Sequence, residues 1–181
     1  MAMELHYDGD LRDSWVIEGS YFYWMIDCGR VEYNQWVQDA LSYLPTEVLE
    51  EHKERLVFIC TGDACRVAPA YRENREIIFL STGLFPKPGA EENEPEYRYF
   101  VFGVLHEIAH AIRNHKSRKF DSISEDEEAD QEREADEIAL EWFNLHVAER
   151  GNPYLPQLTL DEIDTARTRD RERIERIFAH E

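Results

Sequence analysis

Apolar positions in the first half of the chain follow helical spacing in some segments and short continuous runs in others. From 31 to 44 they follow mostly helical spacing, and Pro45 ends that helix before Thr46, which can cap a second one. The earlier segment 13–26 is dense in Trp, Tyr, Phe and Ile and predicts extended, partly buried chain. Three apolar runs bounded by turn residues are typical of strands, at 56–60, 67–71 and 76–81.

The second half of the chain predicts three helices. The first runs from about 96 to 115 and is strongly apolar near its middle. After a polar loop, an acidic helix starts near Glu127 and ends at about Arg150, before a Gly-Asn-Pro sequence. Thr159 and Glu162 match a capping box, which predicts a last, highly charged helix after them.

The order of these elements, with a small sheet first and three helices after it, predicts an α+β fold with a mostly antiparallel sheet. At 181 residues and 43% hydrophobic, the chain can bury one good core, so we predict a single domain over residues 1–181. The net charge is −19, from 39 acidic and 20 basic residues, which disfavours nucleic acid and anionic membranes as partners. No run of about 18 apolar residues is present, so we predict no membrane span.

Cysteine usage and the first residues of the chain predict a cytoplasmic location. Cys28, Cys60 and Cys65 cannot all pair within one chain, and the spacing of the last two is a poor match to a zinc ribbon. The start of the sequence has neither the basic residues nor the apolar core of a secretory signal. Because disulfides are rare in the reducing cytoplasm, we expect these cysteines to be buried free thiols.

The sequence His-Glu-Ile-Ala-His, from His106 to His110, carries the clearest chemistry. On a helix, residues four apart lie on one face, so both imidazoles can reach a single ion. Glu107 lies beside the position left open for water, and its carboxylate can accept the proton of that water as a general base. Zinc is the natural ion, because catalytic zinc takes three protein ligands and keeps one place for water. We therefore predict Zn2+ as the cofactor.

The surroundings of this motif strengthen the prediction. The helix is apolar nearly all round, from Phe100 to Leu105 before the motif and at Ala111 and Ile112 after it, which places it in the interior. Two histidines and a glutamate are costly to bury unless something satisfies them. A metal ion does so.

A third ligand must come from elsewhere in the chain. The sequence Glu-Arg-Glu-Ala-Asp, from Glu132 to Asp136, begins twenty-two positions after His110. With the first motif it resembles the gluzincins, the thermolysin-like zinc peptidases, and its flanks resemble the second motif of the ImmA/IrrE-type peptidases. The resemblance covers roughly 101–145. It implies a minimal zincin-like fold and a zinc metalloendopeptidase, with Glu132 as the third ligand and Asp136 holding the outer nitrogen of His106.

Helical geometry supports this choice but leaves alternatives. One stripe of the acidic helix carries residues at spacings of four, three and four, namely Glu132, Asp136, Ala139 and Phe143. Apolar neighbours direct that stripe toward the core. Glu128, one turn earlier, and Glu134, two residues later, remain alternative third ligands.

The other histidines fit no metal pattern. In the metzincins a third histidine completes the site, but His115 falls one residue short of that position, which Lys116 occupies, and Arg113 stands where a glycine is expected. We therefore interpret His115 as a helix-terminal residue that offsets the helix dipole. Four further histidines have no partner pattern: His6, His52, His146 and His180.

The expected activity is hydrolysis of a peptide bond in a peptide or protein substrate, with Glu107 carrying the proton from water to the leaving amine. The gluzincin resemblance also implies an edge strand that aligns substrate by strand addition. Glu76–Ser81 occupies that place in the chain order, although a plain sheet strand fits equally well. Four residues are candidates to stabilise the oxyanion, Tyr97, Tyr99, Tyr154 and His115.

Two rival functions remain. The chain can be a zinc-binding regulatory or interaction module with the peptidase fold but little general proteolytic activity. It can also be a binding protein without metal, in which the motif is accidental. The intact Glu107 favours catalysis, because a purely structural zinc needs no general base.

Overall fold

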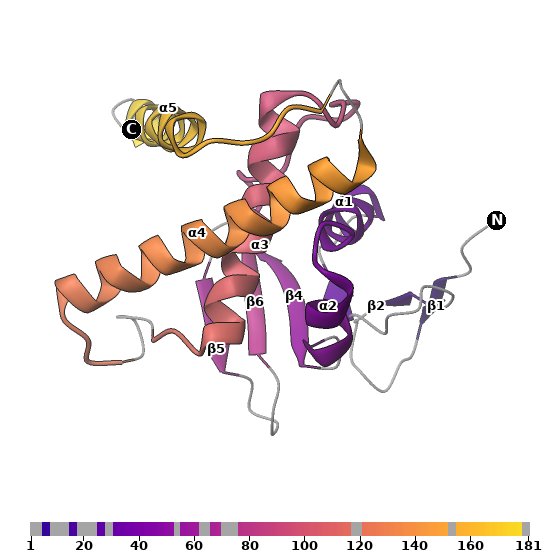
Figure 1. Cartoon of the computed structure of the whole chain (residues 1–181), viewed down its shortest axis with the longest axis horizontal. Helices are drawn as coiled ribbons and strands as arrows, with labels where there is room; N and C mark the ends of the chain where they lie inside the picture. Colours follow the sequence, from indigo (N-terminus) through magenta and orange to yellow (C-terminus); the bar gives the residue numbers. More distant parts are fainter. Residues whose placement is uncertain are drawn as a thin grey trace.

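The computed structural model describes residues 5–7, 15–17, 25–27, 31–52, 55–61, 66–69, 76–116, 121–151 and 155–178. The strands in these ranges are β1 (Leu5–Tyr7), β2 (Trp15–Ile17), β3 (Met25–Asp27), β4 (Leu56–Thr61), β5 (Arg66–Pro69) and β6 (Glu76–Ser81). The helices are α1 (Val31–Leu41), α2 (Thr46–His52), α3 (Pro95–Arg113), α4 (Glu125–Arg150) and α5 (Leu160–Phe178) (Figure 1). The prediction of an α+β fold is confirmed.

The strands form one sheet in the order β1-β2-β3-β4-β6-β5. β4 pairs in parallel with both β3 and β6, whereas the other three pairings are antiparallel. The sheet is therefore mixed, with its parallel pairs in the middle, whereas the sequence predicts a mostly antiparallel sheet.

The edge of the sheet differs from the prediction. β6 was the candidate edge strand, but it pairs with β4 on one side and with β5 on the other. Of the two possibilities for Glu76–Ser81, the plain sheet strand is confirmed and the edge strand is excluded, because β5 folds back antiparallel on the outer side of β6 and takes the edge itself. β6 is the last strand before α3 in the sequence, but the order of strands along the chain does not tell which strand lies outermost in the sheet.

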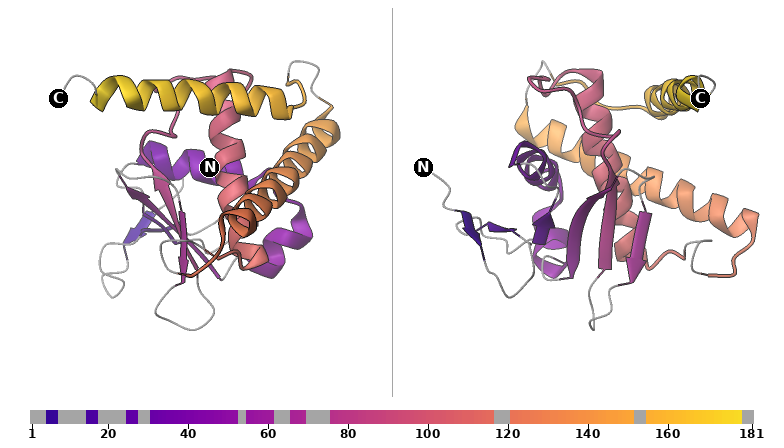
Figure 2. Two further views of the ribbon diagram at one scale, coloured as in Figure 1. Left: turned by 90° about the vertical axis from the view of Figure 1, so that its left-hand side faces the viewer. Right: turned by 180° about the vertical axis from the view of Figure 1, so that it is seen from behind.

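The core lies between the sheet and α3. Alternate residues of a strand point to the same face, and four such residues are almost fully buried: Leu56, Phe58, Ile78 and Leu80. α3 packs on β5 and β6, and α1 packs on β3 (Figure 1). α4 crosses α3 on the side away from the sheet (Figure 2). Enclosed from both sides, α3 is buried at every position from Val104 to Ala109, as its apolar sequence predicts.

Helix ends follow local sequence. The Ser124 side chain accepts a hydrogen bond from the Glu127 N–H at 3.1 Å, so α4 begins two residues earlier than the apolar pattern indicates. The predicted capping box is confirmed: the Thr159 N–H donates to the Glu162 carboxylate at 3.0 Å, and the Glu162 N–H donates to Thr159 Oγ1 at 3.3 Å.

α5 lies beside the end of α3 at which that helix begins, and polar contacts attach it to the rest of the molecule (Figure 2). The Arg98 side chain, only 5% exposed as a residue, donates to Glu162 at 3.1 Å and to two backbone carbonyls just before the helix. Arg167 of α5 reaches α4, where it forms a two-pronged pair with Asp136. α5 therefore places a positive charge close to the middle of α4.

Cys60 is disulfide-bonded, so the prediction of a free thiol is wrong at that position, and Cys28 and Cys65 lie outside the described residues. None of the described helices combines the length and hydropathy needed to cross a membrane.

Candidate metal centre

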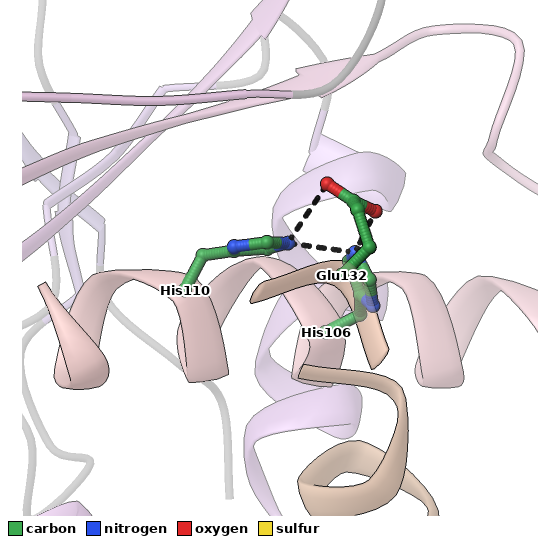
Figure 3. Close-up of side chains that lie close together, drawn as sticks. All are labelled: His106, His110 and Glu132. Carbon is green, nitrogen blue, oxygen red and sulfur yellow. Dashed lines mark hydrogen bonds and ion pairs between the residues drawn. The ribbon is translucent and has the colours of Figure 1, made fainter. Parts of the chain in front are cut away.

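Three side chains from two helices converge where α4 crosses α3. His106 and His110 lie one turn apart on α3, with their Nε2 atoms 3.0 Å from each other. Glu132 on α4 places its Oε2 atom 3.4 Å from His106 Nε2 and its Oε1 atom 3.4 Å from His110 Nε2 (Figure 3). Ligand atoms of the three residues all lie within 4.8 Å of one another, so this group can hold a metal ion.

Burial divides the cluster into a closed side and an open side. The side chains of His106 and His110 are only 9% and 13% exposed, because α3 lies between the sheet and α4. The Glu132 side chain is 53% exposed. A ligand can therefore approach from the side of Glu132, while the imidazoles stay fixed in the interior.

The competing carboxylates are placed elsewhere. Glu134 pairs with Arg113 at 3.1 Å and with the His115 Nε2 atom at 3.4 Å, on the far side of His110. Glu128 is not among the residues that converge on the two histidines in the described part of the chain. The crossing of the two helices thus selects Glu132 from this acidic segment.

The outer nitrogen of His106 has an acidic partner. Asp136 Oδ1 lies 2.8 Å from His106 Nδ1, although off the direction of the ring N–H bond. Asp136 is also held by Arg167, whose two guanidinium nitrogens donate to its two oxygens at 2.7 and 2.6 Å. This is the contact that the resemblance implies for Asp136, with an added arginine from α5 that sequence reasoning missed.

The outer nitrogen of His110 faces His115. Their Nδ1 atoms are 2.9 Å apart, and the His115 side chain is only 7% exposed. A Schellman motif causes this: Asn114 is left-handed at φ 54°, the His115 N–H donates to the His110 carbonyl at 3.0 Å, and the Asn114 N–H donates to the Ala111 carbonyl. The turn folds His115 back over the last turn of α3. Its expected role as a simple helix-terminal charge misses this contact.

Glu107 is buried beside the cluster, at 9% exposure. Burial and, to a smaller extent, the charge of Glu132 raise the pKa of its carboxyl to about 7, against the opposing effect of His106. A carboxyl group with a pKa near neutrality can both accept and release a proton at physiological pH. Its position next to His106 on α3 fits the general-base role that the motif suggests.

The charges of the cluster favour one protonated histidine when no metal is bound. Burial lowers the pKa of His106, but its contacts with Asp136 and Glu132 outweigh burial and raise that pKa to about 9. Burial and the neighbouring His106 lower the pKa of His110 to about 4. The hydrogen bond from His106 lowers the pKa of Glu132. One imidazolium and one neutral imidazole therefore face a carboxylate.

Other residues singled out in the sequence lie away from this cluster. Tyr97 is nine positions before His106, about 13 Å along a helix, and its charged neighbours are Asp39 and Glu92. Tyr99 is two turns before His106 on the same side of α3. His52 belongs to α2, and the His146 ring stacks on Tyr43 at 4.0 Å between centroids. Tyr154 and His180 lie outside the described part of the chain, and so does the side chain of His6.

Two contacts around the cluster had little or no signal in the sequence. Arg167 is one of many charged residues on α5, and nothing in its spacing points to Asp136 thirty-one positions earlier. The contact of His110 with His115 had a weak signal, an asparagine between them at the end of an apolar helix, since asparagine tolerates the left-handed conformation that a Schellman motif needs.

Comparison with models of known protein families gives no match for this chain. Comparisons with curated proteins and with solved structures give none either. The case for a function therefore depends on the geometry of the cluster and on the two motifs that form it.

Proposed function

We propose that this protein is a zinc-dependent metallopeptidase of minimal zincin-like fold. The observation that carries the proposal is the convergence of His106, His110 and Glu132 within 4.8 Å beside the buried Glu107. Two imidazoles and a carboxylate, with one coordination position left for water, form the donor set typical of catalytic zinc in peptidases.

The distances support zinc. Four ligand atoms arranged as a tetrahedron, each about 2.1 Å from zinc, lie about 3.4 Å from one another. Each Glu132 oxygen lies 3.4 Å from one of the two histidine nitrogens, Oε2 from His106 and Oε1 from His110, and the distance between these nitrogens is 3.0 Å. Small movements of the rings therefore suffice to admit the ion. Both outer histidine nitrogens already have partners, which leaves both Nε2 atoms for the ion.

The residues of this chain supply the remaining parts of hydrolysis. A bound zinc ion lowers the pKa of water and polarises a substrate carbonyl. Glu107 accepts the proton of the attacking water and delivers it to the leaving amine, for which its pKa of about 7 is suited.

The substrate we propose is an extended segment of a peptide or protein. β5 is an edge strand of the sheet and packs against α3, the helix that carries the motif. Backbone hydrogen bonds to such an edge hold an extended chain with little demand on its sequence. This assigns to β5 the role that the sequence suggested for β6.

Metal analysis is the first test. Protein purified, stripped with a chelator and reconstituted with zinc should contain about one zinc per chain by mass spectrometry, and Glu132→Ala should retain much less after dialysis. Reconstituted wild-type protein with near-zero metal would rule out the peptidase and leave the metal-free binding protein.

A cleavage assay then separates an enzyme from a regulatory zinc module. Wild-type protein and Glu107→Gln are incubated with a mixed peptide library, and new termini are identified by mass spectrometry. We expect cleavage by the wild type only, with equal zinc content in both proteins. Equal zinc and no cleavage by either protein would favour the regulatory or interaction module.

A further inference from the structure

With both rings neutral, the contact between His110 and His115 allows two proton arrangements. Two neutral imidazole nitrogens 2.9 Å apart are satisfied when one carries the proton and the other accepts it. If His110 donates from Nδ1, its Nε2 has a free lone pair for a metal ion. If His115 donates instead, the proton of His110 sits on Nε2, where it prevents ligation.

Glu134 favours the first arrangement. Its carboxylate lies 3.4 Å from His115 Nε2, and an ionised carboxylate only accepts hydrogen bonds. It therefore holds the His115 proton on Nε2, which leaves His115 Nδ1 as an acceptor for the His110 Nδ1–H. Arg113 pairs with the other oxygen of Glu134 at 3.1 Å and keeps this carboxylate beside His115.

The backbone turn places the His115 ring against His110. The Schellman motif at Asn114 directs His115 back onto His110, and the His115 side chain is buried to 7% exposure. A free helix-terminal histidine that only offsets the helix dipole would extend into solvent. Here the ring is enclosed and has a partner on each nitrogen.

We propose that His115 and Glu134 are positioning residues that hold His110 in its Nδ1–H tautomer, so that its Nε2 is ready to bind a metal ion. Partners of this kind fix the ring orientation and raise the basicity of a ligand histidine. His106 receives the equivalent support from Asp136, so each of the two candidate ligands has its own outer partner. The measurement of zinc affinity described below depends on the proposed function, whereas the measurement of the tautomer does not.

The tautomer is measured directly by nitrogen NMR of the metal-free, labelled protein, because protonated and lone-pair ring nitrogens differ widely in chemical shift. We expect the wild-type His110 to carry its proton on Nδ1. His115→Leu should shift protons to Nε2, where Glu132 can accept them, and His115→Asn should restore the wild-type tautomer through its side-chain oxygen. A wild-type His110 protonated on Nε2 would overturn the proposal.

Zinc affinity, measured by competition with a chromophoric chelator, gives the second readout. We expect roughly ten-fold or greater weakening in His115→Leu and recovery to within about three-fold of wild type in His115→Asn. Glu134→Gln removes a charge at an exposed position, so it tests the contact of Glu134 with His115 without risk to folding. In this variant His110 should populate both tautomers. Glu137→Gln, at an exposed acid three residues further along α4, is the matched control and should bind zinc within about two-fold of wild type.

The two proposals fail in different ways. Wild-type protein that binds no zinc refutes the proposed function, while the NMR measurement still decides the tautomer. Wild-type protein that binds zinc, together with a His115→Leu variant of unchanged tautomer and affinity, refutes the positioning role and leaves the peptidase proposal intact.

Discussion

Replacing Glu107 with glutamine should stabilise the metal-free protein while abolishing hydrolysis. The carboxyl of Glu107 is buried beside His106, and burial raises its pKa from 4.5 to about 7. An acid with a raised pKa in the folded state costs no stability below pH 4.5, where it is protonated in both states. The cost grows as pH rises toward 7 and is constant above that.

The magnitude follows from the same pKa values. A difference between 4.5 and about 7 corresponds to about 3 kcal/mol, because one pKa unit equals about 1.4 kcal/mol. Glutamine has nearly the same shape and no charge, so the variant avoids this cost at every pH. The unfolding free energy of Glu107→Gln minus that of wild type should therefore increase by about 3 kcal/mol between pH 4 and pH 8.

Urea denaturation in the presence of a chelator measures this difference. Unfolding curves of both proteins are recorded at each pH by tryptophan fluorescence and far-ultraviolet circular dichroism. The pH-dependent part of the difference reports Glu107 together with its charge coupling to His106, since the other ionisable groups are shared. A difference that stays constant from pH 4 to pH 8 would refute the claim that this carboxyl is held near neutrality. The proposed role of Glu107 as a base tuned to physiological pH would then lose its physical support.

Three further changes test the surroundings of the site. Glu132→Ala should weaken zinc binding by roughly ten-fold or more, while Glu128→Ala, the matched acid one turn earlier, should not; the reverse result in a chelator competition would reassign the third ligand. Asp136→Asn should lower the free energy of unfolding by about 2 kcal/mol at pH 6, because pairs with His106 and Arg167 lower the pKa of Asp136 to about 2. This loss of stability should vanish as pH falls from about 4 toward 2, which acid titration of both proteins measures. Zinc binding should release about one proton at pH 7.5, since His106 has a pKa of about 9 without metal, and calorimetry in buffers of different ionisation enthalpy detects it.

Local chemistry was predictable from the sequence wherever a short segment decides it. Two histidines four apart on a helix must share a face, so the pairing of His106 and His110 followed from spacing alone. Capping at Thr159 and Glu162 is equally local. The burial of α3 followed from an apolar pattern that has no wet face.

The features that sequence reasoning missed depend on how distant segments pack. The outer position of β5 is set by which side of β6 the chain returns to, and no residue in either strand encodes that. Glu132, Glu128 and Glu134 are equivalent as residues, and only the point at which α4 crosses α3 separates them. A free thiol at Cys60 was predicted from the expected cytoplasmic location, whereas the pairing of cysteines depends on folded distances that the sequence does not contain.

The crossing of the two helices depends on small side chains that carry no chemistry themselves. Ala135 and Ala139 are fully buried on α4, whose main packing partner among the described elements is α3, where Ala109 is also fully buried. Helices approach most closely where such residues meet. Ala135 lies immediately before Asp136, so Ala135→Leu should force the helices apart and move Glu132 beyond its 3.4 Å approach to the histidines. Zinc affinity would then fall with every ligand atom still present. Unchanged affinity in a folded Ala135→Leu protein would mean that flexible side chains, and not the helix crossing, set the geometry of the site.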